Sequence, residues 1–211
     1  MKLLLTSGGL TNEILRNEFL SLVKKPAPEI SVAFITTAAK VEKNTSYMDE
    51  DINDLKIIGV NIVNKIDISD PRGIWEDVLR NSGVIWIEGG NTFYLLDELR
   101  KSGLDKTLIN YLESKVFVGV SAGSIVVTPT IAIAQVEPAD KNEVGITDLS
   151  SLDWVDFEIS PHTSDVVPLV NLEKYVKGIK NKLYAIDDNS AVLLNDNDVK
   201  VIGGGFSKIF N

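Results

Sequence analysis

Short apolar segments rich in β-branched residues alternate, along the first part of the chain, with longer segments whose apolar positions recur every three or four residues. The first pattern is typical of buried strands and the second of amphipathic helices. Strands are predicted at 3–6, 30–36, 60–66, 84–87 and 116–120. Helices are predicted at 12–23, 44–58, 75–80, 92–99 and 104–115. Because strands and helices alternate, we expect an α/β fold with a mostly parallel sheet covered on both faces.

The pattern changes in the second part of the chain, beyond residue 124. A polar stretch at 137–150 is typical of a loop. Further short strands are predicted at 130–134, 157–159, 183–186, 191–194 and 199–202. Turns rich in aspartate and asparagine join the last three, so we expect an antiparallel C-terminal edge on the parallel sheet. No linker, repeat or low-complexity tract divides the sequence, and 1–211 is expected to form a single domain.

Charge narrows the range of partners. The chain has 30 acidic and 21 basic side chains, a formal net charge of −9 at pH 7, which disfavours nucleic acid and anionic membranes as partners. The apolar run at 3–5 is too short for a signal peptide, and no later run approaches the length of a membrane span. We therefore expect a cytoplasmic monomer or homodimer with no nucleic-acid or membrane partner.

Two residue types limit the chemistry. The absence of cysteine excludes disulfides, a thiol nucleophile and thiolate metal sites. His162 is the single histidine, so any imidazole base must be this residue, and one chain cannot form a two-histidine zinc site. The acidic stretch 195–198 lacks the glycine and glutamate of a calcium loop, and the glycines at 8–9 and 203–205 lack the spacing of a phosphate-binding motif. No metal and no cofactor are expected.

Ser121 stands where the apolar strand at 116–120 gives way to a helix. Gly119 and Gly123 on either side allow the chain to fold back without a Cβ clash, which lifts the serine hydroxyl clear of the sheet. A hydroxyl held in this way can act as a nucleophile. The alternative is an ordinary turn in which Ser121 caps the helix.

Three loops follow strands of the predicted parallel sheet, at 6–12, 88–92 and 119–123. Ligands bind at the carboxyl ends of such strands, so these loops should open on one rim. The backbone N–H of Ala122 is a natural donor to an oxyanion, and a second donor could come from Gly90. Asn91 or Thr92 would then cap the next helix, although this loop is also an ordinary strand-to-helix turn.

His162 follows Pro161 and a short predicted strand, which gives it a stiff mount. It is either the base that activates Ser121 or an ordinary surface histidine. The base needs a carboxylate partner, and chain order does not choose among the acidic residues downstream of Ser121. These are Glu137, Asp153, Asp156, Asp165, Asp187 and Asp188.

Segments 118–124, 87–93 and 160–162 together resemble the S51 serine peptidases, the family of bacterial aspartyl dipeptidase and cyanophycinase. The resemblance implies a three-layer sandwich that is flavodoxin-like or similar to class I glutamine amidotransferases. It also implies Ser121 as nucleophile and His162 as base. Asp188 occupies the place of the family's glutamate with a side chain one methylene shorter, and Glu137 is the second candidate for the acid.

We therefore predict a cofactor-independent serine peptidase that cleaves small peptides, including dipeptides, with Gly90, Ala122 and Asn91 at the oxyanion and substrate site. The resemblance suggests substrates with an N-terminal or otherwise acidic aspartate, which would need a basic group in the pocket. The arginines available for this are Arg16, Arg72, Arg80 and Arg100. The alternatives are an esterase or amidase with the same triad, and a catalytically inactive module that binds a small ligand.

Overall fold

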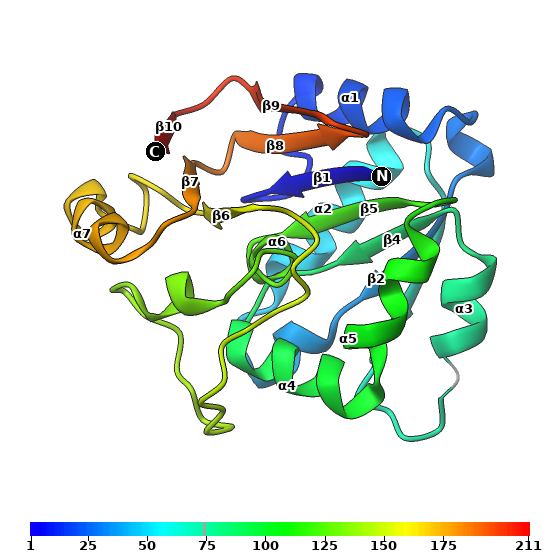
Figure 1. Cartoon of the computed structure of the whole chain (residues 1–211). Coiled ribbons are helices and arrows are strands. Elements are labelled where there is room, and N and C mark those ends of the chain that lie inside the picture. Colours follow the sequence, from blue (N-terminus) through cyan, green and yellow to red (C-terminus); the bar gives the residue numbers. More distant parts are fainter. Residues whose placement is uncertain (74) are drawn as a thin grey trace.

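The computed structural model describes residues 1–73 and 75–211. Within this part of the chain, seven strands form one sheet in the order β3-β2-β4-β5-β1-β8-β9 (Figure 1). The parallel strands are β1 (Lys2–Thr6), β2 (Ser31–Ile35), β3 (Ile62–Ile66), β4 (Val84–Ile87) and β5 (Val116–Val120). The antiparallel strands β8 (Ser190–Asn195) and β9 (Asp198–Gly203) follow β1. A mostly parallel sheet with antiparallel C-terminal strands is therefore confirmed.

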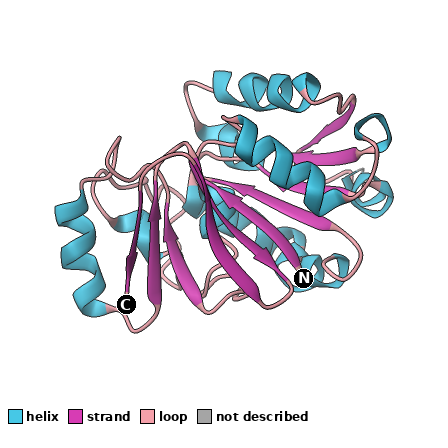
Figure 2. Cartoon of the chain, turned by 90° about the horizontal axis from the view of Figure 1, so that it is seen from above, coloured by secondary structure: helices cyan, strands magenta, loops and turns pink. Residues whose placement is uncertain are grey.

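Helices cover both faces of this sheet (Figure 2). One face carries α1 (Glu13–Val23) and α2 (Ser46–Ile57), and the other carries α3 (Trp75–Asn81), α4 (Thr92–Ser102), α5 (Leu104–Thr107) and α6 (Ala122–Ile125). Successive strand residues point to opposite faces. In β1, Leu4 packs in the core under α1 and α2, whereas Leu3 and Leu5 pack in the core on the other side. The molecule is thus a three-layer sandwich.

A second, smaller sheet in the order β10-β7-β6 packs on the α4–α6 side and shares its core. Its strands are β6 (Phe157–Ser160), β7 (Lys182–Ile186) and β10 (Ser207–Phe210), and α7 (Leu169–Tyr175) lies between β6 and β7 in the chain. The expected place of segment 183–186 in the edge of the main sheet is wrong, because β7 pairs with β6 in parallel and with β10 antiparallel. The turn at 187–189 therefore links two sheets and is not a hairpin.

Two other predicted elements differ from the structure. Segment 130–134 forms a single bridge at Thr130 and a short 3₁₀ turn, η4 (Ala132–Gln135). Two side-chain hydrogen bonds explain why no full strand forms. The Thr128 hydroxyl donates to the Thr130 carbonyl, and the Thr130 hydroxyl accepts from Ala132 N–H. These bonds use backbone groups that would otherwise pair in a strand ladder. The predicted helix 104–115 is α5 followed by η3 (Leu108–Tyr111). No helix in the described ranges is both long and apolar enough to cross a membrane.

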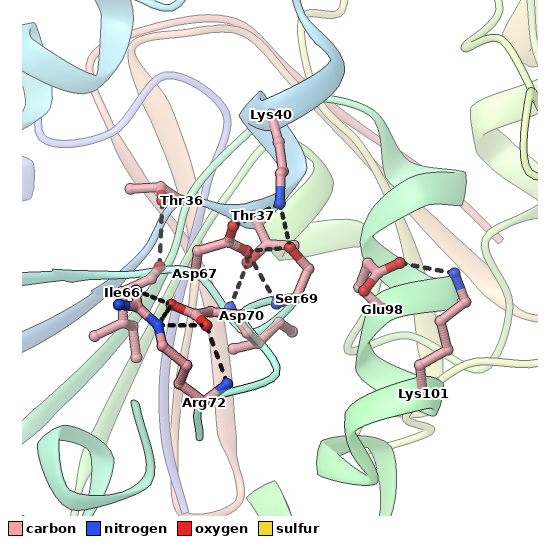
Figure 3. Close-up of polar contacts among 11 residues, drawn as sticks. Thr36, Thr37, Lys40, Ile66, Asp67, Ser69, Asp70, Arg72, Glu98 and Lys101 are labelled. Carbon is pink, nitrogen blue, oxygen red and sulfur yellow. Dashed lines mark hydrogen bonds and ion pairs between the residues drawn. The ribbon is translucent and has the colours of Figure 1, made fainter. Parts of the chain in front are cut away.

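The remaining 3₁₀ turns are η1 (Ala27–Glu29), η2 (Thr37–Val41) and η5 (Val176–Gly178). Polar contacts fix η2 to the segment that follows β3 (Figure 3). The carboxylate of Asp67 accepts hydrogen bonds of 3.0 Å from both the Thr37 hydroxyl and the Lys40 ammonium. The Ala38 carbonyl of η2 in turn accepts the backbone N–H of Asn91 at 3.0 Å. The network therefore supports the loop that follows β4.

Candidate active site

The loops that follow β1, β4 and β5 open on one cavity of about 540 Å³, as expected for the carboxyl ends of a parallel sheet. Ser7, Gly90 and Ser121 line it from these three loops. His162 follows β6, and Asp188 follows β7 in the second sheet, and both line the same cavity. The two sheets thus bring their strand ends together around one space.

Ser121 sits on a sharp turn between β5 and α6, with φ 48° and ψ −110°. A residue other than glycine rarely adopts this conformation, and such strain is typical of functional turns. Its N–H donates to the Thr6 carbonyl of β1 at 3.1 Å, which fixes the turn to the neighbouring strand. Although Ser121 occupies the N-cap position of α6, its side chain makes no capping hydrogen bond. The hydroxyl therefore faces the cavity.

Close backbone packing explains the two glycines beside this turn. A Cβ on Gly119 would lie 2.5 Å from the carbonyl oxygen of Gly123, and a Cβ on Gly123 would lie 2.0 Å from that of Ile87. Real Cβ atoms are not found at these distances, so any side chain would push α6 away from β4 and β5. Both glycines are required by the turn that presents Ser121.

His162 links the serine to a carboxylate. Its Nε2 lies 2.8 Å from Ser121 Oγ, and its Nδ1 lies 2.6 Å from Asp188 Oδ1. An Nδ1–H that donates to Asp188 leaves Nε2 free to accept the serine proton, and we assign this tautomer from the hydrogen-bond partners. The aspartate side chain therefore reaches the ring despite being one methylene shorter than a glutamate.

Ser7 holds both members of this pair. Its hydroxyl donates to Asp188 Oδ1 at 2.6 Å and accepts the backbone N–H of His162 at 2.8 Å. The histidine backbone lies at φ 54°, an uncommon conformation that this contact helps to hold. In the sequence, Ser7 is one residue of the loop at 6–12, directly before Gly8 and Gly9. The signal that could have found it is its place directly after β1, on the predicted rim.

The Asp188 carboxylate is half-buried, and burial by itself raises its pKa. The hydrogen bond from His162, its positive charge when protonated and the hydrogen bond from Ser7 act against burial and hold the pKa below its ordinary value. Asp188 is therefore ionised at neutral pH.

Glu137 lies elsewhere. Its side chain is exposed and accepts the backbone N–H of Ala139 at 3.2 Å. Within the described residues, the carboxylate that contacts His162 is that of Asp188. The neighbouring Asp187 instead accepts the N–H groups of Phe206 and Asn189, which holds the link between the two sheets. The structure thus brings Ser121, His162 and Asp188 together and leaves Glu137 apart.

The loop after β4 lies directly beside the serine. A Cβ on Gly89 would be 3.3 Å from Ser121 Cβ, and one on Gly90, at φ 131°, would be 2.3 Å from the Ala38 carbonyl oxygen. Within the described residues, neither Gly90 N–H nor Ala122 N–H has a hydrogen-bond acceptor. Asn91 faces another way and is not a lining residue, because its side chain accepts from Tyr94 N–H and donates to the Lys141 carbonyl.

A buried pair of carboxyl groups, absent from the sequence interpretation, forms another part of the cavity wall. Asp51 of α2 is 5% exposed, and Glu88, which follows β4, is fully buried. Glu88 accepts hydrogen bonds from Gly89 N–H at 2.8 Å and from the Trp86 indole at 3.0 Å. Burial, and then the charge of Glu88, raises the pKa of Asp51 well above its usual range, and burial also raises the pKa of Glu88. The two adjoining carboxyls therefore hold their protons to a higher pH than isolated carboxyls do.

A serine, a histidine and a carboxylate in one hydrogen-bonded series at the strand ends of an α/β sandwich define a serine hydrolase. The model of peptidase family S51 matches residues 3–202 of the chain. The chain therefore belongs to peptidase family S51, a family of serine peptidases.

Individual relatives agree with this assignment. The uncharacterized peptidase Lmo0363 of Listeria monocytogenes is 32% identical over 173 residues, which cover 80% of this chain and 84% of that protein. Peptidase E of Salmonella typhimurium is 28% identical over 142 residues, 65% of this chain and 57% of the relative. A crystal structure from Listeria monocytogenes EGD-e, named as a candidate peptidase E, has a TM-score of 0.82 at 28% identity and covers 97% of this chain and 98% of that one. The predicted family and fold are confirmed.

Proposed function

We propose that this protein hydrolyses small peptides through an acyl-enzyme, with Ser121 as nucleophile, His162 as base and Asp188 as the acid that orients it. The observation that carries the proposal is the unbroken series from Ser121 Oγ to His162 Nε2 at 2.8 Å and from Nδ1 to Asp188 Oδ1 at 2.6 Å. The whole chain, 1–211, is assigned to a single peptidase domain, because residues of both sheets pack in one core.

In the first half of the reaction, Ser121 Oγ attacks the scissile carbonyl while His162 Nε2 removes the hydroxyl proton. Asp188 stabilises the imidazolium that forms and keeps the ring in its tautomer. His162 then donates the proton to the leaving amine, the C–N bond breaks, and an ester to Ser121 remains. A water molecule, deprotonated by His162, attacks this ester and releases the acid product and the serine.

The tetrahedral intermediates of both halves carry a negative oxygen, which needs donors that are not used elsewhere. The N–H groups of Gly90 and Ala122 are assigned this role. Their lack of acceptors within the described residues supports the assignment, as does the contact of the Gly89 backbone with Ser121. Asn91 contributes indirectly, because it caps α4 and fixes the end of the loop that carries Gly90.

The size and lining of the cavity support short peptides as substrates. Its volume of about 540 Å³ lies in the range of small-molecule sites. Apolar side chains from the end of α6, from the segment after it and from the His162 loop provide contacts for a peptide and exclude water from the reacting bond. These residues are Ile125, Ile133, Val136, Val166 and Val167.

The test combines covalent labelling with hydrolysis. We expect a fluorophosphonate to label Ser121, as mapped by mass spectrometry of digested protein, and we expect the wild-type protein to cleave members of a dipeptide and tripeptide panel. Ser121→Ala should lose the label and reduce kcat by about 10⁴-fold or more. Ser114→Ala, which changes an exposed serine far from the cavity, serves as the matched control.

Each of the alternatives has its own outcome. Turnover of short esters without cleavage of any peptide would overturn the peptidase and leave an esterase. A folded wild-type protein that neither reacts with the fluorophosphonate nor cleaves peptides would overturn catalysis and leave a binding module. Unchanged hydrolysis by Ser121→Ala would overturn the assignment of the nucleophile.

A further inference from the structure

The loop that follows β4, at 88–92, uses nearly all of its backbone N–H groups. Within the described residues, each N–H but one in this loop has an acceptor. The acceptors for Glu88, Gly89, Asn91 and Thr92 are the Ile35 carbonyl, the Glu88 carboxyl group, the Ala38 carbonyl and the Asp140 carboxylate. The N–H of Gly90 is the exception. The loop is therefore tightly fixed around a single N–H that is left for another partner.

The peptide group between Gly89 and Gly90 sets the direction of that N–H. In a planar trans peptide the carbonyl and the N–H point in opposite directions. Gly90 has φ 131°, and a rotation of the peptide plane by about 180° would bring φ into the negative region that all residues adopt. Neither residue has a Cβ that would block this rotation. The observed direction of the N–H therefore needs a contact that holds the peptide.

Tyr47 of α2 makes such a contact. Its side chain lines the cavity, and its hydroxyl donates to the Gly89 carbonyl at 3.4 Å. In the part of the chain that the structure describes, no other group donates to this carbonyl. Burial, and then the charge of Glu88, raises the pKa of Tyr47, so its hydroxyl keeps the proton that it donates. Because the distance is long for a hydrogen bond, we assign it a modest share in holding the peptide.

The two faces of the main sheet give this contact a direction. Tyr47 belongs to α2 on one face, whereas Ala122 begins α6 on the other. A Gly89 carbonyl that points toward Tyr47 turns the N–H of Gly90 away from α2, toward the face that carries Ala122. The same loop packs against the nucleophile, since a Cβ on Gly89 would lie 3.3 Å from Ser121 Cβ. The contact therefore favours the orientation in which both N–H groups serve one oxygen.

We propose that Tyr47 is a positioning residue for oxyanion binding, which holds the peptide between Gly89 and Gly90 so that the Gly90 N–H faces the oxygen where charge develops. This inference rests on the proposed function, in which Gly90 is an oxyanion donor, and adds a residue outside the triad. Tyr47 acts through the Gly89 carbonyl and does not touch the reacting atoms. Since the oxyanion exists only in the tetrahedral intermediates, the hydroxyl should affect kcat and leave substrate binding unchanged.

Steady-state kinetics of Tyr47→Phe gives the first test. The phenylalanine keeps the ring and removes the donor to the Gly89 carbonyl. We expect kcat in peptide hydrolysis to fall about 5- to 10-fold, the effect of one neutral hydrogen bond, with KM changed less than two-fold. Tyr111→Phe is the matched control, because this tyrosine of η3 does not line the cavity. Unchanged kcat, or a rise in KM alone, would overturn the inference.

A pair of inhibitors separates oxyanion binding from substrate binding. Ser121 Oγ adds to the carbonyl carbon of a peptide aldehyde, its proton passes to His162, and the former carbonyl oxygen becomes the oxyanion of a hemiacetal. The matching peptide alcohol has no carbonyl at this place and forms no such adduct. We expect Tyr47→Phe to bind the aldehyde about 5- to 10-fold more weakly than wild type and the alcohol equally well. Equal losses for both inhibitors would overturn the inference.

Two further measurements keep the outcomes distinct. Thermal unfolding confirms that each variant is folded, and Tyr47→Leu, with the same expected difference between aldehyde and alcohol, is the second variant should Tyr47→Phe fail to fold. Fluorophosphonate labelling of Ser121 in the wild-type protein is measured in parallel. Its absence, together with no peptide cleavage, would count against the proposed peptidase. A wild-type protein that is labelled and active, beside a Tyr47→Phe protein with unchanged aldehyde affinity, would overturn this inference alone.

Discussion

Two aspartates in the same cavity wall have opposite surroundings. Asp188 receives hydrogen bonds from His162 and Ser7 and has a lowered pKa. Asp51 is more deeply buried, faces the carboxyl group of Glu88 and has a raised pKa. The loop of Gly8 and Gly9 lies between them. Hydrogen-bond donors, rather than residue type, therefore decide which aspartate has a lowered pKa and which one holds its proton to a higher pH.

Within this comparison of carboxylates, the largest expected effect is the difference in kcat between a variant of Asp188 and a variant of its neighbour Asp187. Asp188→Asn places an amide at His162 Nδ1, which cannot stabilise the imidazolium and favours the wrong tautomer. We expect kcat to fall about 10³- to 10⁴-fold in peptide hydrolysis. Asp187→Asn is the matched control, because Asp187 accepts N–H groups in the link between the sheets and does not contact His162. Comparable kcat losses in the two variants would mean that Asp188 acts through the fold alone.

A smaller effect is expected at Ser7, which holds His162 and Asp188 without touching Ser121 in the structure. Ser7→Ala removes one donor to the carboxylate and the acceptor of His162 N–H. We expect kcat to fall about 10-fold, the value of roughly one such hydrogen bond, with KM changed less than two-fold. Steady-state kinetics on the same peptide panel measures both constants. A rise in KM with unchanged kcat would show that Ser7 contacts substrate and does not position the base.

The sequence was informative where one residue type has a narrow set of roles. Ser121 could be found because Gly119 and Gly123 mark a turn of special geometry, and His162 because no other imidazole exists. The alternation of apolar segments was sufficient for the layers and for the parallel sheet. Asp188 followed from the family resemblance, since spacing alone left several carboxylates equivalent.

The sequence was uninformative where burial depends on contacts distant along the chain. Asp51 lies on a charged segment that is typical of a solvent-exposed helix face, and its burial depends on Gly9 and Glu88, which belong to other loops. In the same way, the aspartate-rich turn at 187–189 fits a hairpin and a link between sheets equally well. The pairing of β7 with β10 decides between these two possibilities. β10 lies further along the chain, after β8 and β9.

The smallest expected effect is on the pH dependence of the stability of the fold, to which the two aspartates contribute with opposite signs. A lowered pKa stabilises the fold above the ordinary carboxyl pKa, and Asp188 loses this contribution as pH falls. A raised pKa does the opposite: neutral Asp51 contributes fully below the ordinary pKa of about 4, and the contribution is lost as pH rises toward the folded value.

Because asparagine cannot ionise, the melting temperature of Asp51→Asn relative to wild type should rise by about 2–4 °C between pH 5 and pH 8. Thermal unfolding at both pH values measures the difference, with Asp49→Asn expected to show no such change. A difference that is independent of pH would mean that Asp51 is ionised in the free cavity, and the contrast with Asp188 would disappear.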